Sequence, residues 1–136
     1  MNKCHVVALA AAIAAASLCG RGVPGFTPAA LGADPPVSFK EDVLPVFVGR
    51  CVSCHGAPNG EGFKASGLDL TTYKGVMAGT KFGPMVIPGN PDSSNLVRLL
   101  DWQASPQLRM PHGKKQLSVC DRDAIRTWIR QGAKDN

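Results

Sequence analysis

The chain has 136 residues, which is enough for one domain and not for two. Aromatic residues make up 6% of it, so a core built from side chains alone would be thin. The formal net charge of +5 is mild and no run of Lys or Arg is longer than Lys114-Lys115, so nucleic-acid binding is not expected. The five cysteines are an odd number, which argues against a framework of disulfides.

The first part of the chain has the pattern of an export leader. Lys3 gives a positive start, and the uncharged apolar run Val6–Leu18 has signal-peptide length, short of the roughly 20 residues of a membrane span. Cleavage after Ala14–Ala16 would cut into this run, so we favour cleavage after Leu31–Ala33. We therefore predict that residues 1–33 are signal peptide and linker.

The first predicted helix belongs to the folded part, residues 34–136. Ser38 and Glu41 have the spacing of a capping box, which predicts the start of this helix. Pro45 should kink or split the helix, because proline lacks a backbone N–H. One apolar face of the helix is formed by Phe39, Val43 and Phe47.

A short motif follows this helix: Cys51, Cys54 and His55 form Cys-x-x-Cys-His, the attachment pattern of c-type haem. Two thiols on one helical turn can each add to a haem vinyl group. His55 is then the proximal ligand of the iron. The motif predicts one covalently bound heme c, held through Cys51 and Cys54, and a buried haem would also fill the thin core.

Two other interpretations of the motif are zinc binding and a redox dithiol. A structural zinc site needs two further ligands at matching spacing, yet the only later cysteine and histidine are Cys120 and His112. A thioredoxin-like dithiol needs a βαβ context, which the helical patterns do not supply. Covalent haem is therefore the favoured interpretation.

The middle of the chain predicts a loop and a short helix. Gly56–Gly62 is a loop by composition, and Leu68 and Leu70 alternate with polar neighbours in an extended piece. Thr71 or Thr72 can cap a helix that runs through Ala78 and ends at Gly79.

A turn-rich stretch, residues 84–91, leads into another helix. Asn90 looks like an N-cap with Pro91 at the first helical position. The helix should end near Trp102, and its apolar face is formed by Leu96, Leu99 and Leu100.

Met110 is the candidate for the second axial ligand of the iron. It lies in a loop between two predicted helices, and Pro111 should stiffen that loop. A thioether sulfur favours ferrous iron and raises the reduction potential. An open site is the other possibility, and the rival ligands are His112, Met77 and Met85.

The last predicted helix is the clearest. Ser118 is a candidate N-cap with Asp121 three residues later, and Gly132 is a natural stop. We expect Trp128 to pack against the first helix. The apolar stripe of this last helix is formed by Ala124, Ile125, Trp128 and Ile129.

Taken together, the chain resembles a small class I c-type cytochrome, and more narrowly the planctomycete-type cytochrome c domain. The resemblance implies an all-α, cytochrome c-like fold of about four helices around one covalently attached haem, with crossed terminal helices. It also implies iron ligation by His55 and Met110 and a role in electron transfer. The matching segments are Phe39–Pro45, Cys51–Gly56, Pro88–Ser94, Met110-Pro111 and Trp128–Ala133.

Two function classes follow from these observations. The favoured one is an electron carrier, not an enzyme, that is periplasmic or otherwise extracytoplasmic, with a dehydrogenase, an oxidase or a membrane electron-transfer complex as redox partner. Peripheral association with a membrane stays open. The alternative is a haem enzyme or gas-binding sensor with an open or weakly held sixth ligand. Candidates for a basic ring around the haem edge are Lys64, Lys81, Arg109, Lys114 and Lys115.

Overall fold

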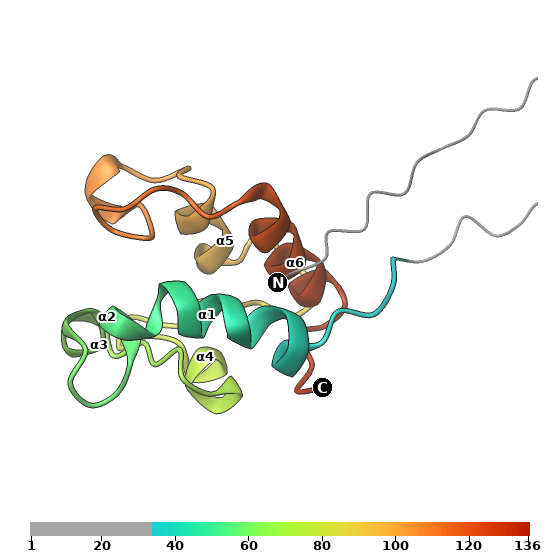
Figure 1. Cartoon of the computed structure of the whole chain (residues 1–136), viewed down its shortest axis with the longest axis horizontal. Helices are drawn as coiled ribbons and strands as arrows, with labels where there is room; N and C mark the ends of the chain where they lie inside the picture. Colours follow the sequence, from blue (N-terminus) through green and yellow to red (C-terminus); the bar gives the residue numbers. More distant parts are fainter. Residues whose placement is uncertain (1–33) are drawn as a thin grey trace, which may run out of the picture. The chain divides into compact units, whose positions relative to one another are not determined.

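The computed structural model describes residues 34–136, and the predicted leader, residues 1–33, lies outside them. The described residues form helices and no strand, so the all-α prediction is confirmed. Where about four helices were predicted, this part of the chain has more and shorter ones (Figure 1). They are the π-helix η1 (Phe39–Val43), α1 (Leu44–Arg50), α2 (Val52–His55), α3 (Glu61–Ser66), α4 (Tyr73–Ala78), α5 (Asn95–Leu100), the 3-10 helix η2 (Pro106–Leu108) and α6 (Val119–Arg130).

The first predicted helix is split, as Pro45 led us to expect. Its first turn is the π-helix η1, closed by the Leu44 amide donating to the Phe39 carbonyl, and α1 follows with Pro45 near its start. Ser38 caps η1 by accepting from the Glu41 amide at 3.2 Å. The return bond of the capping box is made by Asp42, whose carboxylate accepts from the Ser38 amide at 2.8 Å.

Two predictions about the middle of the chain are wrong. Helix α3 begins at Glu61, inside the predicted loop Gly56–Gly62, because Gly62 in its first turn favours a loop by composition, yet the helix packs closely against α2. Helix α5 begins at Asn95 and not after Asn90. The Asn90 side chain instead accepts from the Ser93 amide at 3.0 Å, which closes a turn ahead of the helix. The predicted cap of α4 by Thr72 is confirmed.

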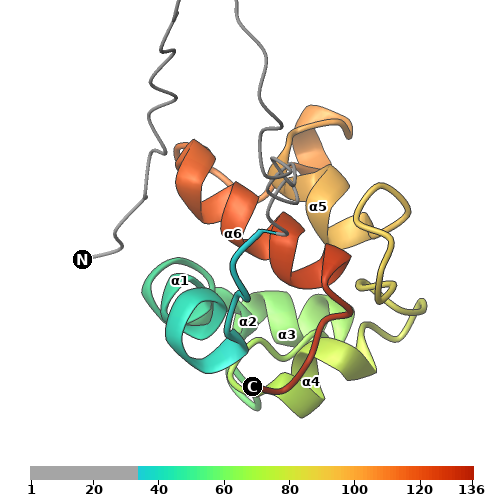
Figure 2. The ribbon, with the colours of Figure 1, turned by 90° about the vertical axis from the view of Figure 1, so that its right-hand side faces the viewer.

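The core is built where the two ends of the described chain meet. Trp128 of α6 is 1% exposed, and its ring centroid lies 5.3 Å from that of Phe39. The Tyr73 hydroxyl donates to the Ala133 carbonyl at 2.9 Å, and the Lys40 amide donates to the Asn136 carbonyl at 3.0 Å. The predicted packing of Trp128 against the first helix is thus confirmed. Figure 2 shows α5 and α6 on one side of this unit and α1 to α4 on the other.

An ion-pair cluster joins the end of α5 to α6. The carboxylate of Asp101 is 8% exposed and accepts from Arg122 at 2.8 Å and also from Arg126. Asp92 is a second partner of Arg126 at 3.6 Å, but its side chain is 90% exposed. Burial makes the Asp101 pairs worth far more than the exposed Asp92 pair, since exposed ion pairs are screened by water.

None of the helices between residues 34 and 136 has the length and apolar character that a membrane span requires.

Asp101→Ala should lower the free energy of unfolding by about 2–3 kcal/mol. This loss is somewhat below that of a fully buried pair, because the two arginines keep some contact with water. Urea unfolding of the purified protein measures it. The matched control is Asp92→Ala, which removes a carboxylate from the same cluster and should cost less than about 0.5 kcal/mol. Equal losses for the two variants would contradict this account of the cluster.

Candidate haem-binding site

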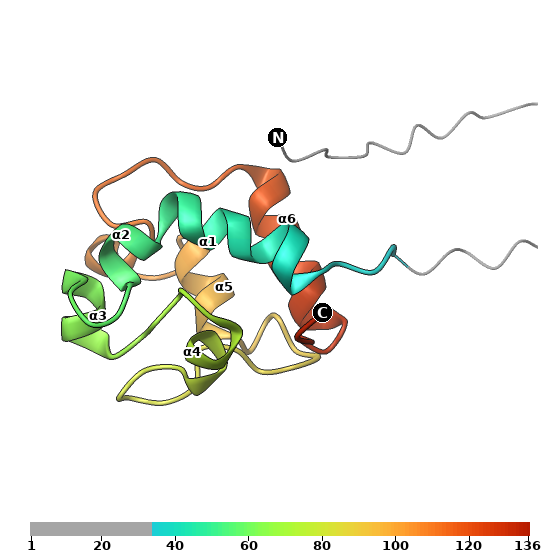
Figure 3. The same ribbon diagram turned by 60° about the horizontal axis from the view of Figure 1, so that its bottom comes forward.

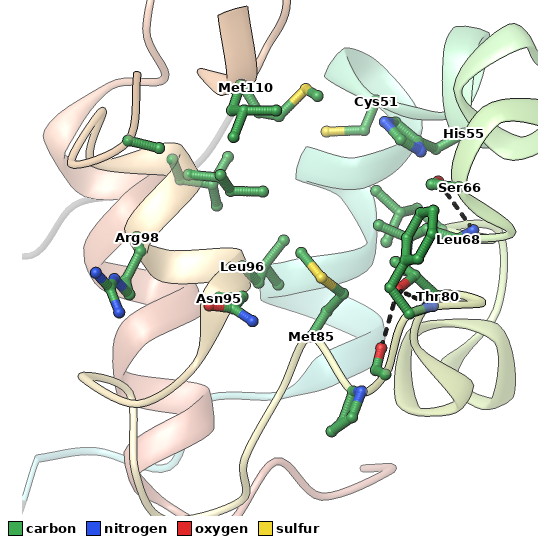
Figure 4. Close-up of a pocket in the computed structure, with 18 of the residues that line it drawn as sticks. Cys51, His55, Ser66, Leu68, Thr80, Met85, Asn95, Leu96, Arg98 and Met110 are labelled. Carbon is green, nitrogen blue, oxygen red and sulfur yellow. Dashed lines mark hydrogen bonds between the residues drawn. The ribbon is translucent and has the colours of Figure 1, made fainter. Parts of the chain in front are cut away.

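A cavity of about 720 Å³ lies between the motif and helix α5. This volume is within the range of roughly 300–1,000 Å³ that ligand cavities occupy. Its wall is mostly apolar, and Figure 4 shows Leu68 and Leu96 on it. Cys51, His55 and Met110 all line this cavity, although Met110 lies far along the chain from the other two.

The motif is held as a single helical turn at the end of α1. The amides of Cys54 and His55 both donate to the Cys51 carbonyl, at 3.0 and 2.8 Å. This turn puts Cys51 and His55 on the cavity wall, while Cys54 is exposed beside them. The Cys51 amide in turn donates to the Phe47 carbonyl at 2.8 Å, so the turn continues directly from α1. The position of the motif therefore follows from the packing of α1 on the core.

His55 is prepared to act as a neutral ligand. Burial lowers the pKa of its imidazole, and the nearby Leu68 carbonyl only partly opposes this effect. The Leu68 contact falls short of a full hydrogen bond, because the Nδ1 atom is buried without a partner. A neutral imidazole binds iron without first losing a proton. A buried ring nitrogen that lacks a partner fits a histidine whose hydrogen bonds are completed when a group binds.

Cys51 is the more protected of the two motif thiols. Burial raises the pKa of Cys51 to about 11, against the opposing positive charges of Arg50 and Lys114. The thiol is therefore neutral at physiological pH and does not react as a free thiolate. Arg50 also donates to the Lys115 carbonyl at 3.2 Å, which ties the segment after η2 to the end of α1. Figure 3 shows this segment, in orange to red, running past α1 and α2.

The structure separates the candidates for the second axial ligand. Met110 and Met85 line the cavity, whereas Met77 and His112 do not, and His112 is exposed. In Figure 4 the Met110 side chain extends toward Cys51 and His55, while Met85 enters from the other end of the cavity.

Two hydrogen bonds of the Met110 backbone fix the position of this residue. Its amide donates to the Leu99 carbonyl at 3.2 Å, and its carbonyl accepts from the indole N–H of Trp102 at 3.0 Å. Both partners belong to α5 or follow directly on it, so the loop that presents Met110 is anchored to a core helix.

Two basic residues lie beside the attachment motif. Arg50 and Lys114 are the two positive charges that act on Cys51. Lys114 was on the sequence-based list, but Arg50 was missed. Its position directly before the motif was the available signal. Lys81, also on that list, lies over the ring of Phe82, a residue of the cavity wall, at 5.2 Å from the ring centroid.

The residues present fit a c-type haem. An apolar cavity, two thiols one turn apart and a half-buried imidazole whose pKa is lowered match the chemistry of covalent attachment and iron ligation. Within residues 34–136 no group of three or more His, Cys, Asp or Glu side chains is placed to hold a metal ion.

Residues 51–112 match the family model described as Planctomycete cytochrome C. This part of the chain is therefore similar to the cytochrome c domain of that family. The resemblance inferred from the sequence is confirmed, and the matched segment runs from Cys51 to His112, so it includes the motif and Met110. Comparisons with curated proteins and with solved structures gave no match. The bounds 34–136 of the cytochrome c domain stay a prediction, as do the haem-binding roles of the individual residues.

Proposed function

We propose that this protein is a single-haem c-type cytochrome that carries one electron between extracytoplasmic redox partners. The observation that supports it most strongly is the shared cavity wall, on which Cys51 and His55 meet Met110. The turn at the end of α1 supplies the attachment motif, and a loop anchored on α5 supplies a soft sulfur ligand. The family match over residues 51–112 adds to this support.

Each residue has a distinct part in this proposal. Cys51 and Cys54 hold the haem through thioether bonds, and His55 and Met110 bind the iron from its two faces. The bound haem supplies an iron that gains or loses a single electron. Two protein ligands leave no place for water or substrate, which favours electron transfer over catalysis. A high reduction potential is expected, because a thioether stabilises the ferrous state.

Location outside the cytoplasm rests on the sequence of residues 1–33. These residues combine a positive start with an apolar run of signal-peptide length. Covalent attachment of c-type haem also takes place outside the cytoplasm, so export and the motif support the same proposal.

Protein purified from its native host should carry one covalent haem and lack its leader. Mass spectrometry of the acid-denatured chain measures both, since the mass gains one haem and loses the residues before the cleavage site. Cys51→Ala with Cys54→Ala should abolish the added mass. Haem that extracts from the wild type into acidified organic solvent would contradict covalent attachment, and a mature chain that starts at Met1 would contradict leader removal.

Met110→Ala should remove the iron–sulfur charge-transfer band and lower the reduction potential. We expect a drop of more than about 0.1 V, a modest part of the ~0.8 V range over which axial ligands tune haem iron. The ferrous protein should also gain the ability to bind carbon monoxide. Visible spectra and a redox titration measure these changes.

Met85→Ala is the matched control for this experiment, because it removes the other methionine of the cavity wall. It should retain the band, and its reduction potential should stay close to that of the wild type. Loss of the band in Met85→Ala alone would assign the ligand to Met85. Ready binding of carbon monoxide by the wild type would favour the gas sensor or haem enzyme instead.

The surface beside Cys51 fits an acidic redox partner, such as a dehydrogenase, an oxidase or a membrane electron-transfer complex. Arg50 and Lys114 lie close enough to Cys51 to influence the pKa of its thiol. Because Cys51 marks the attached edge of the haem, these charges lie where an electron would leave or enter. Opposite charge on a partner would steer the two proteins together.

Arg50→Gln with Lys114→Gln should slow reduction by a small acidic electron donor at low ionic strength. We expect a loss of roughly threefold to tenfold, which disappears when salt shortens the Debye length from about 30 Å to about 8 Å. Stopped-flow kinetics measures the rate constant. Lys40→Gln with Lys134→Gln is the matched control, since it also removes two positive charges, from exposed side chains in η1 and in the C-terminal segment. An equal loss in the control would show that net charge, and not this surface, governs the rate.

A further inference from the structure

Helix α3 presses its backbone against the imidazole of His55. A Cβ atom added at Gly62 would lie 2.8 Å from Cε1, 2.9 Å from Nε2 and 3.0 Å from Nδ1 of that ring. Three nearly equal distances place this point over the face of the ring and not at its edge. Real Cβ atoms essentially never come so close, so no side chain fits here while the ring keeps its orientation.

The chain around Leu68 also lies close to His55. Its carbonyl is close enough to the imidazole to act on the pKa of the ring. Two residues further on, the Leu70 amide donates to the His55 carbonyl at 2.8 Å. The chain after α3 therefore contacts both the side chain and the backbone of His55.

Ser66 forms hydrogen bonds with both Gly62 and Leu68. Its hydroxyl donates to the Gly62 carbonyl at 2.6 Å and accepts from the Leu68 amide at 3.2 Å, the latter bond being drawn in Figure 4. A single hydroxyl thus connects the residue over the ring face to the residue whose carbonyl lies beside the ring.

We propose that Gly62, Ser66 and Leu68 form a positioning element that fixes the rotation of the His55 ring, and with it the orientation of the imidazole plane at the iron. This inference rests on the proposed function. Groups around a ligating histidine commonly set its orientation. Here the restraint is steric on the ring face, through a position where only glycine leaves the ring in this orientation, and the bond from the Leu70 amide to the His55 carbonyl holds the backbone of the same residue. Gly62 and Ser66 act through His55 and do not touch the iron.

The test uses the ferric holoprotein and its proton NMR spectrum. The imidazole plane decides how unpaired spin is distributed over the porphyrin, so the positions of the haem methyl signals report its orientation. Gly62→Ala should change the order of these signals. Gly49→Ala is the matched control, because Gly49 is also helical and a Cβ there meets nothing within 4 Å. It should leave the order unchanged.

Ser66→Ala is a second, milder variant, which covers the case that Gly62→Ala yields no holoprotein. It removes the hydrogen bond between Ser66 of α3 and the Leu68 amide without adding an atom. It should also change the positions of the haem methyl signals. A merely structural role would lower the stability of both variants without moving these signals. Wild-type spectra in both variants, or in Ser66→Ala when Gly62→Ala gives no holoprotein, would overturn this inference alone. A wild-type protein without haem would overturn the proposed function as well.

Discussion

Trp128 packs its ring against Phe39, and through this contact the last helix holds the first. Both rings are almost fully buried, and backbone bonds from η1 to Asn136 close the same region. Because α1 continues from η1 and the motif turn continues from α1, the place of Cys51 and His55 follows from this packing. A change that loosens α6 is therefore expected to reach the candidate site, although no residue of α6 lines the cavity.

The features that the sequence predicted correctly are those set by local chemistry. Ser38, Thr72 and Ser118 each cap a helix, because a side-chain oxygen three residues before an amide is enough to make that bond. Pro45 splits the first helix for an equally local reason, its missing N–H. The motif needs only the spacing of Cys51, Cys54 and His55, which one helical turn brings together.

The features that the sequence missed depend on contacts between distant segments. Helix α3 contains Gly62, a residue that favours a loop by composition, yet only glycine fits there while the His55 ring keeps its orientation. Asn90 has the chemistry of a cap, but buried Ser94 bonds the Asn90 carbonyl at 2.8 Å and holds the segment as a turn. Met85 could be listed as a rival ligand, but only the fold shows that it shares the cavity wall with Met110.

The two candidate iron ligands are held by the polypeptide in different ways. His55 is limited by a helix backbone on its ring face and by Leu68 beside it, so its side chain has little room to rotate. Met110 has a flexible side chain, but its backbone is bonded to Leu99 and Trp102. A rigid imidazole with an anchored, adaptable thioether suits an iron that changes charge. In the proposed cytochrome the sulfur could adjust slightly while the haem stayed seated, so little of the surrounding structure would have to move when an electron arrived or left.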